Sequence, residues 1–300
     1  MYLSTDQFTT SFPVTSSPSY TEMTLHEQGS GTWNEDVLLK EGDLYGVFDG
    51  ATSLEKNPSR SGLSGGFQAA SIAAETFRHH VGPLAQAAEV ANHRIRTAQG
   101  YDRIPPDQRL RLWSTSLAAI HLHETSFEYC HTGDCMIMLL HHDGSHSLLS
   151  PELDIDSETL ALWQQSPDSG QTIHSLLAEQ IADVRLQMNV SYGVLNGEPE
   201  AMKFFRHGQH SLAGVSDILL FTDGLMLPKA DPTSPTDWQS FADIYCRGGL
   251  NAIRDHVRTA QQTDPACRYY PRFKMHDDIA AIALTVDGVA SPECKLPQSC

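Results

Sequence analysis

Three apolar segments of the chain each meet an aspartate at one end. They are LYGVF before Asp49, ILLFT before Asp223, and IAAIAL after Asp277 and Asp278. Carboxylates grouped in a core raise one another's pKa and destabilise the fold, so they need a cation or hydrogen-bond donors. Mg²⁺ or Mn²⁺ fits best, because these hard ions prefer oxygen ligands. The pattern predicts a metal centre in which two ions could hold a phosphoryl group and activate a water.

The repetition of the motif carries this prediction, because a single Asp-Gly pair is more often a turn. We assign Asp143-Gly144 and Asp287-Gly288 to turns. Glu35 and Asp36 would be a solvated turn if they stood alone, but they lie one hairpin before Asp49. For Asp134 a turn between strands and a metal ligand are about equally supported.

The apolar periodicity predicts the elements that must position these residues. Residues 37–39 and 44–48 read as a hairpin, and the spacing predicts two long helices over 63–77 and 84–95. Residues 116–149 read as an antiparallel meander of short strands, 152–190 as a cap, and 218–222 and 279–286 as further strands. This order predicts an α+β sandwich of two antiparallel sheets flanked by helices.

Composition narrows the class of protein. The net charge of −17 over 300 residues repels nucleic acids and anionic membranes. No apolar run approaches the roughly 20 residues that cross a bilayer, and the six cysteines form no Cys-x-x-Cys pair. Residues 1–24 lack the features of a secretory or transit signal, so we expect a flexible leader. We expect a monomer of the reducing cytoplasm that binds neither nucleic acid nor membrane.

Five short motifs occur in an order that resembles a known family. They are NED at 34–36, GVFDG at 46–50, TGD at 132–134, FTDG at 221–224 and HDDIAAIAL at 276–284. Together they resemble the metal-dependent protein phosphatases of the 2C type, in particular bacterial serine/threonine phosphatases. The resemblance implies a four-layer α/β/β/α sandwich, with a Mn²⁺ or Mg²⁺ pair where the sheets meet. It further implies one phosphatase domain over 25–290, a flap over 152–210 and a tail over 291–300.

The resemblance also implies a role for each acidic residue. Asp49 would bridge the two ions and act in catalysis, the Gly50 carbonyl would bind one ion, and Asp223 and Asp277 would complete the other. Glu35 and Asp36 match an acidic pair that acts largely through metal-held waters, so Asp36 is a second catalytic candidate. Asp134 matches an aspartate that can join a third ion. Asp278 stands where the family often has Asn, and it would replace Asp277 if the register is off by one.

Two positions depart from the family pattern. Gly31 stands where many members have an arginine that binds the substrate phosphate, and no basic residue lies between His26 and Lys40. Ala51-Thr52 stands where many have a histidine proposed to protonate the leaving group. His26, His276 or a metal-held water could supply that proton.

Three functions therefore stay open. The first is hydrolysis of phosphoserine or phosphothreonine by a water activated by the ion pair. The second is a catalytically weak relative that binds a phosphorylated partner and regulates, and the third is a phosphatase of small metabolites. The G-x-S-x-G pattern at 62–66 is not a serine nucleophile, because no apolar strand precedes it, and Ser61 or Ser64 is expected to cap a helix there.

Overall fold

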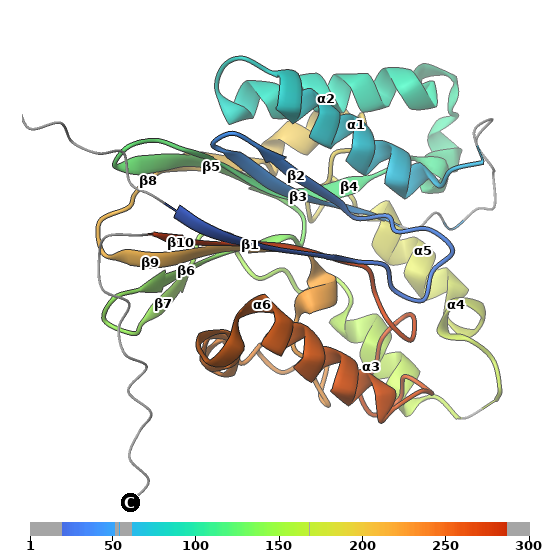
Figure 1. Cartoon of the computed structure of the whole chain (residues 1–300). Helices are drawn as coiled ribbons and strands as arrows, with labels where there is room; N and C mark the ends of the chain where they lie inside the picture. The colour runs from blue at the N-terminus through green and yellow to red at the C-terminus, as the bar shows by residue number, and fades with distance from the viewer. Residues whose placement is uncertain (1–19, 52–53, 55–61, 168, 287–300) are drawn as a thin grey trace, which may run out of the picture.

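Two five-stranded antiparallel sheets pack face to face and carry helices on their outer faces (Figure 1). The computed structural model describes residues 20–51, 54, 62–167 and 169–286. Helices α1 and α2 lie over one sheet and α6 lies over the other, so the layers run α/β/β/α. The predicted α+β sandwich is confirmed.

The first sheet has the strand order β1-β10-β9-β6-β7. Its strands are β1 (Tyr20–Glu27), β6 (Met136–His141), β7 (His146–Leu148), β9 (Val215–Phe221) and β10 (Ile279–Val286). The second sheet has the order β2-β3-β4-β5-β8. Its strands are β2 (Val37–Glu41), β3 (Leu44–Gly50), β4 (Thr115–Leu122), β5 (Ser126–Thr132) and β8 (Arg206–Ser211).

Two long helices follow the β2–β3 hairpin, and a third precedes the last strand. The α-helices are α1 (Gly65–His79), α2 (Leu84–Gln99), α3 (Ser157–Gln165), α4 (Ile173–Leu176), α5 (Ala178–Leu186) and α6 (Trp238–Gln262). Ser64 caps α1, because its Oγ accepts a hydrogen bond from Phe67 N at 3.1 Å. Ser61 lies outside the described residues. None of the helices in the described ranges is long and apolar enough to cross a membrane.

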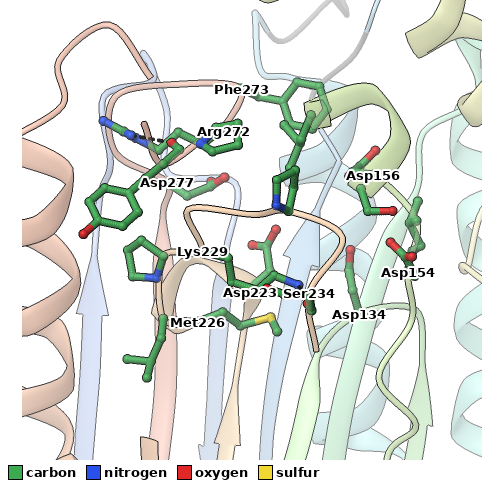
Figure 2. Close-up of a pocket in the computed structure, with 18 of the residues that line it drawn as sticks. Asp134, Asp154, Asp156, Asp223, Met226, Lys229, Ser234, Arg272, Phe273 and Asp277 are labelled. Carbon is green, nitrogen blue, oxygen red and sulfur yellow. Dashed lines mark hydrogen bonds between the residues drawn. The ribbon is translucent and has the colours of Figure 1, made fainter. Parts of the chain in front are cut away.

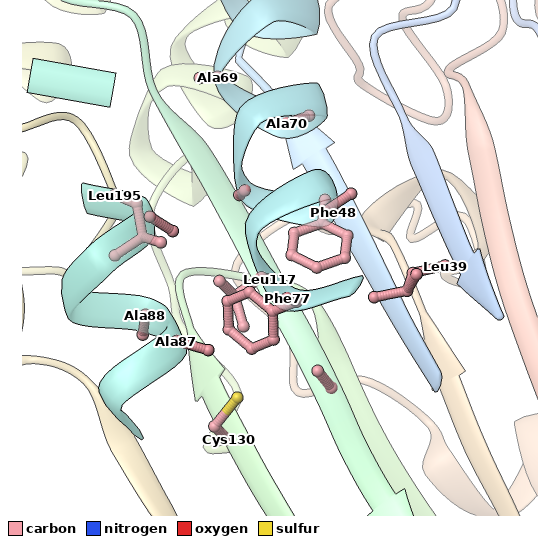
Figure 3. Close-up of a cluster of buried hydrophobic side chains, with 14 of the residues drawn as sticks. Leu39, Phe48, Ala69, Ala70, Phe77, Ala87, Ala88, Leu117, Cys130 and Leu195 are labelled. Carbon is pink, nitrogen blue, oxygen red and sulfur yellow. The ribbon is translucent and has the colours of Figure 1, made fainter. Parts of the chain in front are cut away.

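The apolar side chains form one layer between the sheets and one under each outer helix layer. Val47, Ile120 and Ile282 are fully buried between the two sheets. Alternate residues of the same strands face outward, where Phe48 meets Phe77 of α1 with ring centroids 5.4 Å apart (Figure 3). Burial on both faces explains why these strands read as continuous apolar runs.

The predicted meander over 116–149 is right in its two hairpins but wrong in joining them into one sheet. The four strands are present, but β4 and β5 belong to one sheet while β6 and β7 belong to the other. The chain crosses between the sheets at Gly133 and Asp134. Gly133 has φ +79°, and a Cβ there would contact the side chain of Ser116, so this close crossing requires glycine.

The structure also differs from the expected segments at their ends. Residues 20–24, expected in the leader, form part of β1, which pairs with β10 from Tyr20 to Glu27. Residues 206–210, expected in the flap, belong to β8, an edge strand that pairs with β5. Helix α6 had no counterpart in the predicted elements, because Gly248 and Gly249 interrupt its helical geometry and its apolar spacing.

The segment with α3, α4 and α5 lies at one end of the sandwich (Figure 1). It is attached to the loop before β10 through Trp163, whose Nε1 donates to the carbonyl of Cys267 at 2.7 Å. The guanidinium of Arg268 lies 3.3 Å from the centre of the Trp163 ring. These contacts hold the segment beside the strand ends that carry the acidic residues.

Candidate active site

The strand register brings the aspartates to one end of the sandwich. Phe221 pairs with Ala281 of β10 on one side and with Met136 of β6 on the other. Asp223 follows β9, Asp277 precedes β10 and Asp134 precedes β6, so all three lie at the same end of one sheet. Asp49 is the penultimate residue of β3 in the facing sheet.

These four aspartates line one cavity of about 180 Å³. A larger cavity of about 420 Å³ adjoins it and shares Asp134, Asp223 and Asp277. Figure 2 shows Asp277 and Asp134 on either side of Asp223, with Asp154 and Asp156 beyond Asp134. Segments from four parts of the sequence therefore meet in one acidic cleft.

Asp36 lies beneath this cleft and is only 3% exposed. Its Oδ2 accepts a hydrogen bond from the hydroxyl of Thr222 at 2.7 Å. Burial raises the pKa of Asp36 well above its usual range despite this bond, and repulsion from Asp277 and Asp223 raises it further. A nearby cation or a bound proton would offset this unfavourable charge.

The same forces act on two residues that line the cleft. Burial first, and then the charges of Asp36 and Asp134, raise the pKa of Asp49. Burial first, and then the charges of Asp277 and Asp49, raise the pKa of Asp223. Each group is thus destabilised in its ionised form by the others, as expected for a site that gathers carboxylates around a cation.

Asp278 faces the backbone rather than either cavity. Its Oδ1 accepts from Gly29 N at 2.7 Å and its Oδ2 accepts from Glu35 N at 2.9 Å. Asp278 is 2% exposed, and both of its oxygens are used to hold the loop that carries the acidic pair. The adjacent residues Asp277 and Asp278 thus have separate positions, one facing the cleft and one fixing the loop.

Glu35 and Gly50 meet the start of helix α1. A Cβ on Gly66 would lie 2.8 Å from Glu35 Oε1 and 2.7 Å from the carbonyl oxygen of Ala51. The Glu35 carboxylate therefore lies against the N-terminus of the helix, where the helix dipole favours a negative charge. A Cβ on Gly50 would likewise contact the backbone of Gly66, so both positions require glycine.

Lys274 is a residue of the cleft that sequence reasoning missed. It lines both cavities, and its Nζ lies 2.7 Å from Asp277 Oδ1. Burial lowers the pKa of Lys274, but the charges of Asp277, Asp278 and Asp49 outweigh burial and raise it overall. Its position three residues before Asp277 was the available signal, since i and i+3 side chains can meet in a tight turn.

Several residues of the flap segment reach the smaller cavity, and two of them are an aspartate and a histidine. Asp156 and His174 both line it. Burial raises the pKa of Asp156 to about 6, while burial and the nearby Arg185 lower the pKa of His174. Neither had a sequence signal, because cap residues reach the site only through the docking of their helices.

The proton donors proposed from the sequence lie elsewhere. Nε2 of His26 is 3.1 Å from the carbonyl oxygen of Asp36, and Nδ1 of His276 is 2.8 Å from Gln261 Oε1. Neither histidine is among the described residues that line the two cavities. Ala51 lines the smaller cavity and offers no titratable side chain, while Thr52 lies outside the described residues.

The donor set fits a hard divalent cation in its chemistry. The aspartates of the smaller cavity offer only oxygen ligands, and the raised pKa values of Asp49 and Asp223 are ones that a cation would offset. Within the described ranges, however, no three His, Cys, Asp or Glu side chains are arranged to hold an ion as they stand. Asp277 instead pairs with the ammonium of Lys274.

Comparison with known families decides the assignment. The family model described as protein phosphatase 2C matches residues 26–262. The chain belongs to the protein phosphatase 2C family. The match includes the acidic pair, Asp49, Asp134 and Asp223, and it ends before Asp277. A comparison of the sequence with curated proteins gives no match.

Solved structures of bacterial serine/threonine phosphatases share this fold. The Mycobacterium tuberculosis serine/threonine phosphatase PstP is 16% identical with a TM-score of 0.56, and the match covers 90% of this chain and 99% of that one. PppA of Pseudomonas aeruginosa is 17% identical with a TM-score of 0.54, covering 89% and 97%. The catalytic domain of PstP solved in complex with two manganese ions is 15% identical with a TM-score of 0.54, covering 89% and 98%. At these identities the likeness establishes the fold.

Proposed function

We propose that this protein is a metal-dependent phosphomonoester hydrolase that acts on phosphoserine or phosphothreonine. The observation that carries the proposal is the convergence of Asp49, Asp134, Asp223 and Asp277 on one cavity. These residues come from both sheets and from the link between them. Membership of the 2C family supports hydrolysis as the chemistry of this cavity.

Asp49, Asp223 and Asp277 would hold two Mn²⁺ or Mg²⁺ ions, with the carbonyl of Gly50 as a further oxygen ligand. Bound ions of this kind lower the pKa of a water and neutralise charge on a phosphoryl group. Asp134 would take part in a third, weaker site. Because the ligands must be ionised, the raised pKa values of Asp49 and Asp223 would make ion binding release protons.

The chain's own residues would position the reaction. Asp36 and Glu35 lie behind the ligands, so each can orient a water rather than contact the substrate. Thr222 fixes the Asp36 carboxylate by its 2.7 Å hydrogen bond. Asp278 holds the loop of the acidic pair through Gly29 N and Glu35 N, so we assign it a positioning role instead of a ligand role.

The larger cavity supports a phosphorylated protein as substrate. It extends from the aspartates along Pro228, Pro232 and Pro235 and past Tyr270 and Phe273. Its volume of about 420 Å³ exceeds that of the acidic cavity, about 180 Å³. Groups that flank a phosphorylated side chain would have room there, whereas a bare phosphate would not use it.

Hydrolysis of p-nitrophenyl phosphate and of phosphoserine and phosphothreonine peptides tests the proposal. We expect turnover that requires Mn²⁺ or Mg²⁺ and stops in EDTA. Turnover that resists EDTA would contradict metal-dependent hydrolysis. Peptides that react with a higher kcat/KM than p-nitrophenyl phosphate would support the protein substrate, and the reverse order would favour a small phosphorylated metabolite.

A catalytically weak regulator is the second candidate, and two observations favour it. Gly31 and Ala51 stand at the positions where many 2C phosphatases carry the arginine and the histidine. Calorimetry separates the two functions. A regulator would bind a phosphopeptide in saturating Mn²⁺ with negligible turnover, whereas rapid release of phosphate would exclude it.

A further inference from the structure

A cleft lined by aspartates needs a positive charge before it can hold a phosphate. A phosphate monoester carries about two negative charges at neutral pH. Bound dications would neutralise part of this charge, and many 2C phosphatases add an arginine. Here Gly31 stands at that position, and no basic residue lies between His26 and Lys40.

Few cations reach the cleft from the described part of the chain. Lys229 and Arg272 line the larger cavity but not the smaller one, and Arg185 lines the smaller cavity but not the larger one. Of the described lysines and arginines, Lys274 is the one that lines both. It is therefore placed where the acidic cavity opens into the larger one.

The other cations of the larger cavity are held by protein groups. The guanidinium of Arg272 donates to Asp264 Oδ2 at 3.0 Å, to the Gln261 carbonyl at 2.9 Å and to the Tyr270 carbonyl at 2.7 Å. Nζ of Lys229 donates to the carbonyl of Ser234 at 2.9 Å. The bonds of Arg272 hold its charge to the wall of the larger cavity, and Lys229 does not line the smaller cavity that Asp49 lines.

The ammonium of Lys274 is free to take a further acceptor. It carries three N–H donors, and Asp277 accepts one of them. The side chain is 28% exposed, so it has access to the cleft. Four flexible bonds let a lysine ammonium move toward a new oxygen without any change of backbone.

We propose that Lys274 binds a phosphoryl oxygen of the substrate and so takes over the task of the missing arginine. The inference rests on the proposed phosphatase function and names the residue that holds the phosphate. Asp277 would keep the ammonium oriented until a phosphate enters. A lysine offers a point charge rather than a two-pronged donor, so the orientation of the phosphate would depend more on the carboxylate-held ions.

Binding of inorganic phosphate to the full chain in saturating Mg²⁺ tests this inference by calorimetry. Loss of a charge-assisted hydrogen bond predicts that Lys274→Met raises the Kd of phosphate by roughly 10- to 100-fold. The KM for p-nitrophenyl phosphate should rise similarly, and Lys274→Arg should recover most of the affinity. Lys229→Met is the matched control, because Lys229 lines only the larger cavity, and its phosphate Kd should match that of the wild type.

A titration of Mn²⁺ without phosphate separates two roles of Lys274. If Lys274 only neutralises the aspartates, Lys274→Met changes the Kd of Mn²⁺ and leaves the phosphate Kd within twofold, which overturns the inference. The inference would also be overturned if the wild type hydrolyses substrate and both Lys274→Arg and Lys274→Met bind phosphate with the wild-type Kd. That result would leave the proposed function intact. A wild-type chain that neither binds phosphate nor hydrolyses substrate would end both. Circular dichroism of each variant excludes misfolding as the cause.

Discussion

Asp278 Oδ2 accepts a hydrogen bond from Glu35 N at 2.9 Å, across 243 positions of the sequence. Its Oδ1 accepts from Gly29 N at 2.7 Å. One carboxylate thus ties the loop before β2 to the start of β10, and it sets where Glu35 and Asp36 stand relative to Asp277. The position of the acidic pair depends on a residue that does not line the cleft.

Replacing Asp278 by alanine should therefore destabilise the protein. Each N–H left without an acceptor costs about 1–3 kcal/mol in the free energy of unfolding. Asp278→Asn should fall between the alanine variant and the wild type, because one amide oxygen can serve one N–H. Urea denaturation measures the effect. Asp255→Asn is the control at an exposed aspartate, with an expected change within about 0.5 kcal/mol. Equal stability of Asp278→Ala and Asp255→Asn would contradict the assigned role.

Asp49→Asn should remove most of the Mn²⁺-dependent hydrolysis of p-nitrophenyl phosphate, by at least about 100-fold. The amide keeps the shape of the side chain but loses the charge that would bind the ions. Because the pKa of Asp49 is raised by burial and by its neighbours, the substitution should not lower the melting temperature of the metal-free chain. Asp143→Asn, in an exposed turn, should keep full activity. An active Asp49→Asn variant would refute the proposed ligand role.

The stability of the metal-free protein should depend on pH through Asp36. The pKa of this group is higher in the folded chain than in the unfolded chain, so the folded state holds the proton more strongly. The contribution of this protonation to the free energy of unfolding is complete below the pKa of Asp36 in the unfolded chain, which is about 4. It is lost as the pH rises through the pKa of Asp36 in the folded chain. Asparagine has no proton to lose, and it can still accept from Thr222.

The advantage of Asp36→Asn over the wild type should therefore grow with pH, by up to about 1.4 kcal/mol per pH unit within that window. Urea unfolding in EDTA at pH 5, 6, 7 and 8 measures the difference. Glu27 and Glu198 make stability depend on pH in the opposite direction, because arginine partners lower their pKa values despite burial. Both glutamates are present in the variant and in the wild type, so the comparison cancels their effect. Two curves that stay parallel over this range would contradict the raised pKa.

Mn²⁺ should stabilise the wild-type chain, and more at pH 8 than at pH 5, because protons compete for the same carboxylates. Ion concentrations near 100 times Kd should add about 2.7 kcal/mol for one site. Differential scanning calorimetry with and without Mn²⁺ gives the shift. Asp223→Asn should reduce it at both pH values. An equal shift in wild type and Asp223→Asn would place the ions elsewhere.

Gly66→Ala should disturb the site through contact rather than charge. Its Cβ would lie 2.7 Å from the Ala51 carbonyl oxygen and 2.8 Å from Glu35 Oε1, so helix α1 must shift, at a cost of roughly 1–3 kcal/mol. Gly31→Ala is the control, since its nearest neighbour is the Trp33 carbonyl oxygen at 3.4 Å. Thermal unfolding compares the two. A stability loss as large in Gly31→Ala would remove the steric explanation.

The sequence predicted the strands and their aspartates because both leave local signals. Asp49, Asp223 and Asp277 lie at strand ends that the apolar runs mark directly, and the structure brings all three to one cavity. The assignment of β5 and β6 to different sheets could not be predicted in this way. An apolar strand after a tight turn looks the same whether it joins the previous sheet or the opposite one.

The contacts of Lys274 and Asp278 could not be predicted from the local sequence either. The spacing of Lys274 and Asp277 allows their contact, but nothing in FKMHDD shows that the ammonium lies where distant segments form the cleft. Asp278 differs from Asp277 only in the direction of its side chain. Side chains of neighbouring residues in extended backbone point to opposite sides, and the packing of the 29–35 loop decides which side is the cleft.

Because Asp36 and Asp49 lie at the end of one sheet and Asp223 and Asp277 at the end of the other, the carboxylates are neighbours only while the sheets stay packed. A compact intermediate that kept its strands but loosened its interior would retain its far-ultraviolet dichroism and scatter these groups. The proposed ion affinity would therefore be a property of the finished tertiary structure. A dye that reports free Mn²⁺ would follow the last stage of folding, which secondary structure alone does not reveal.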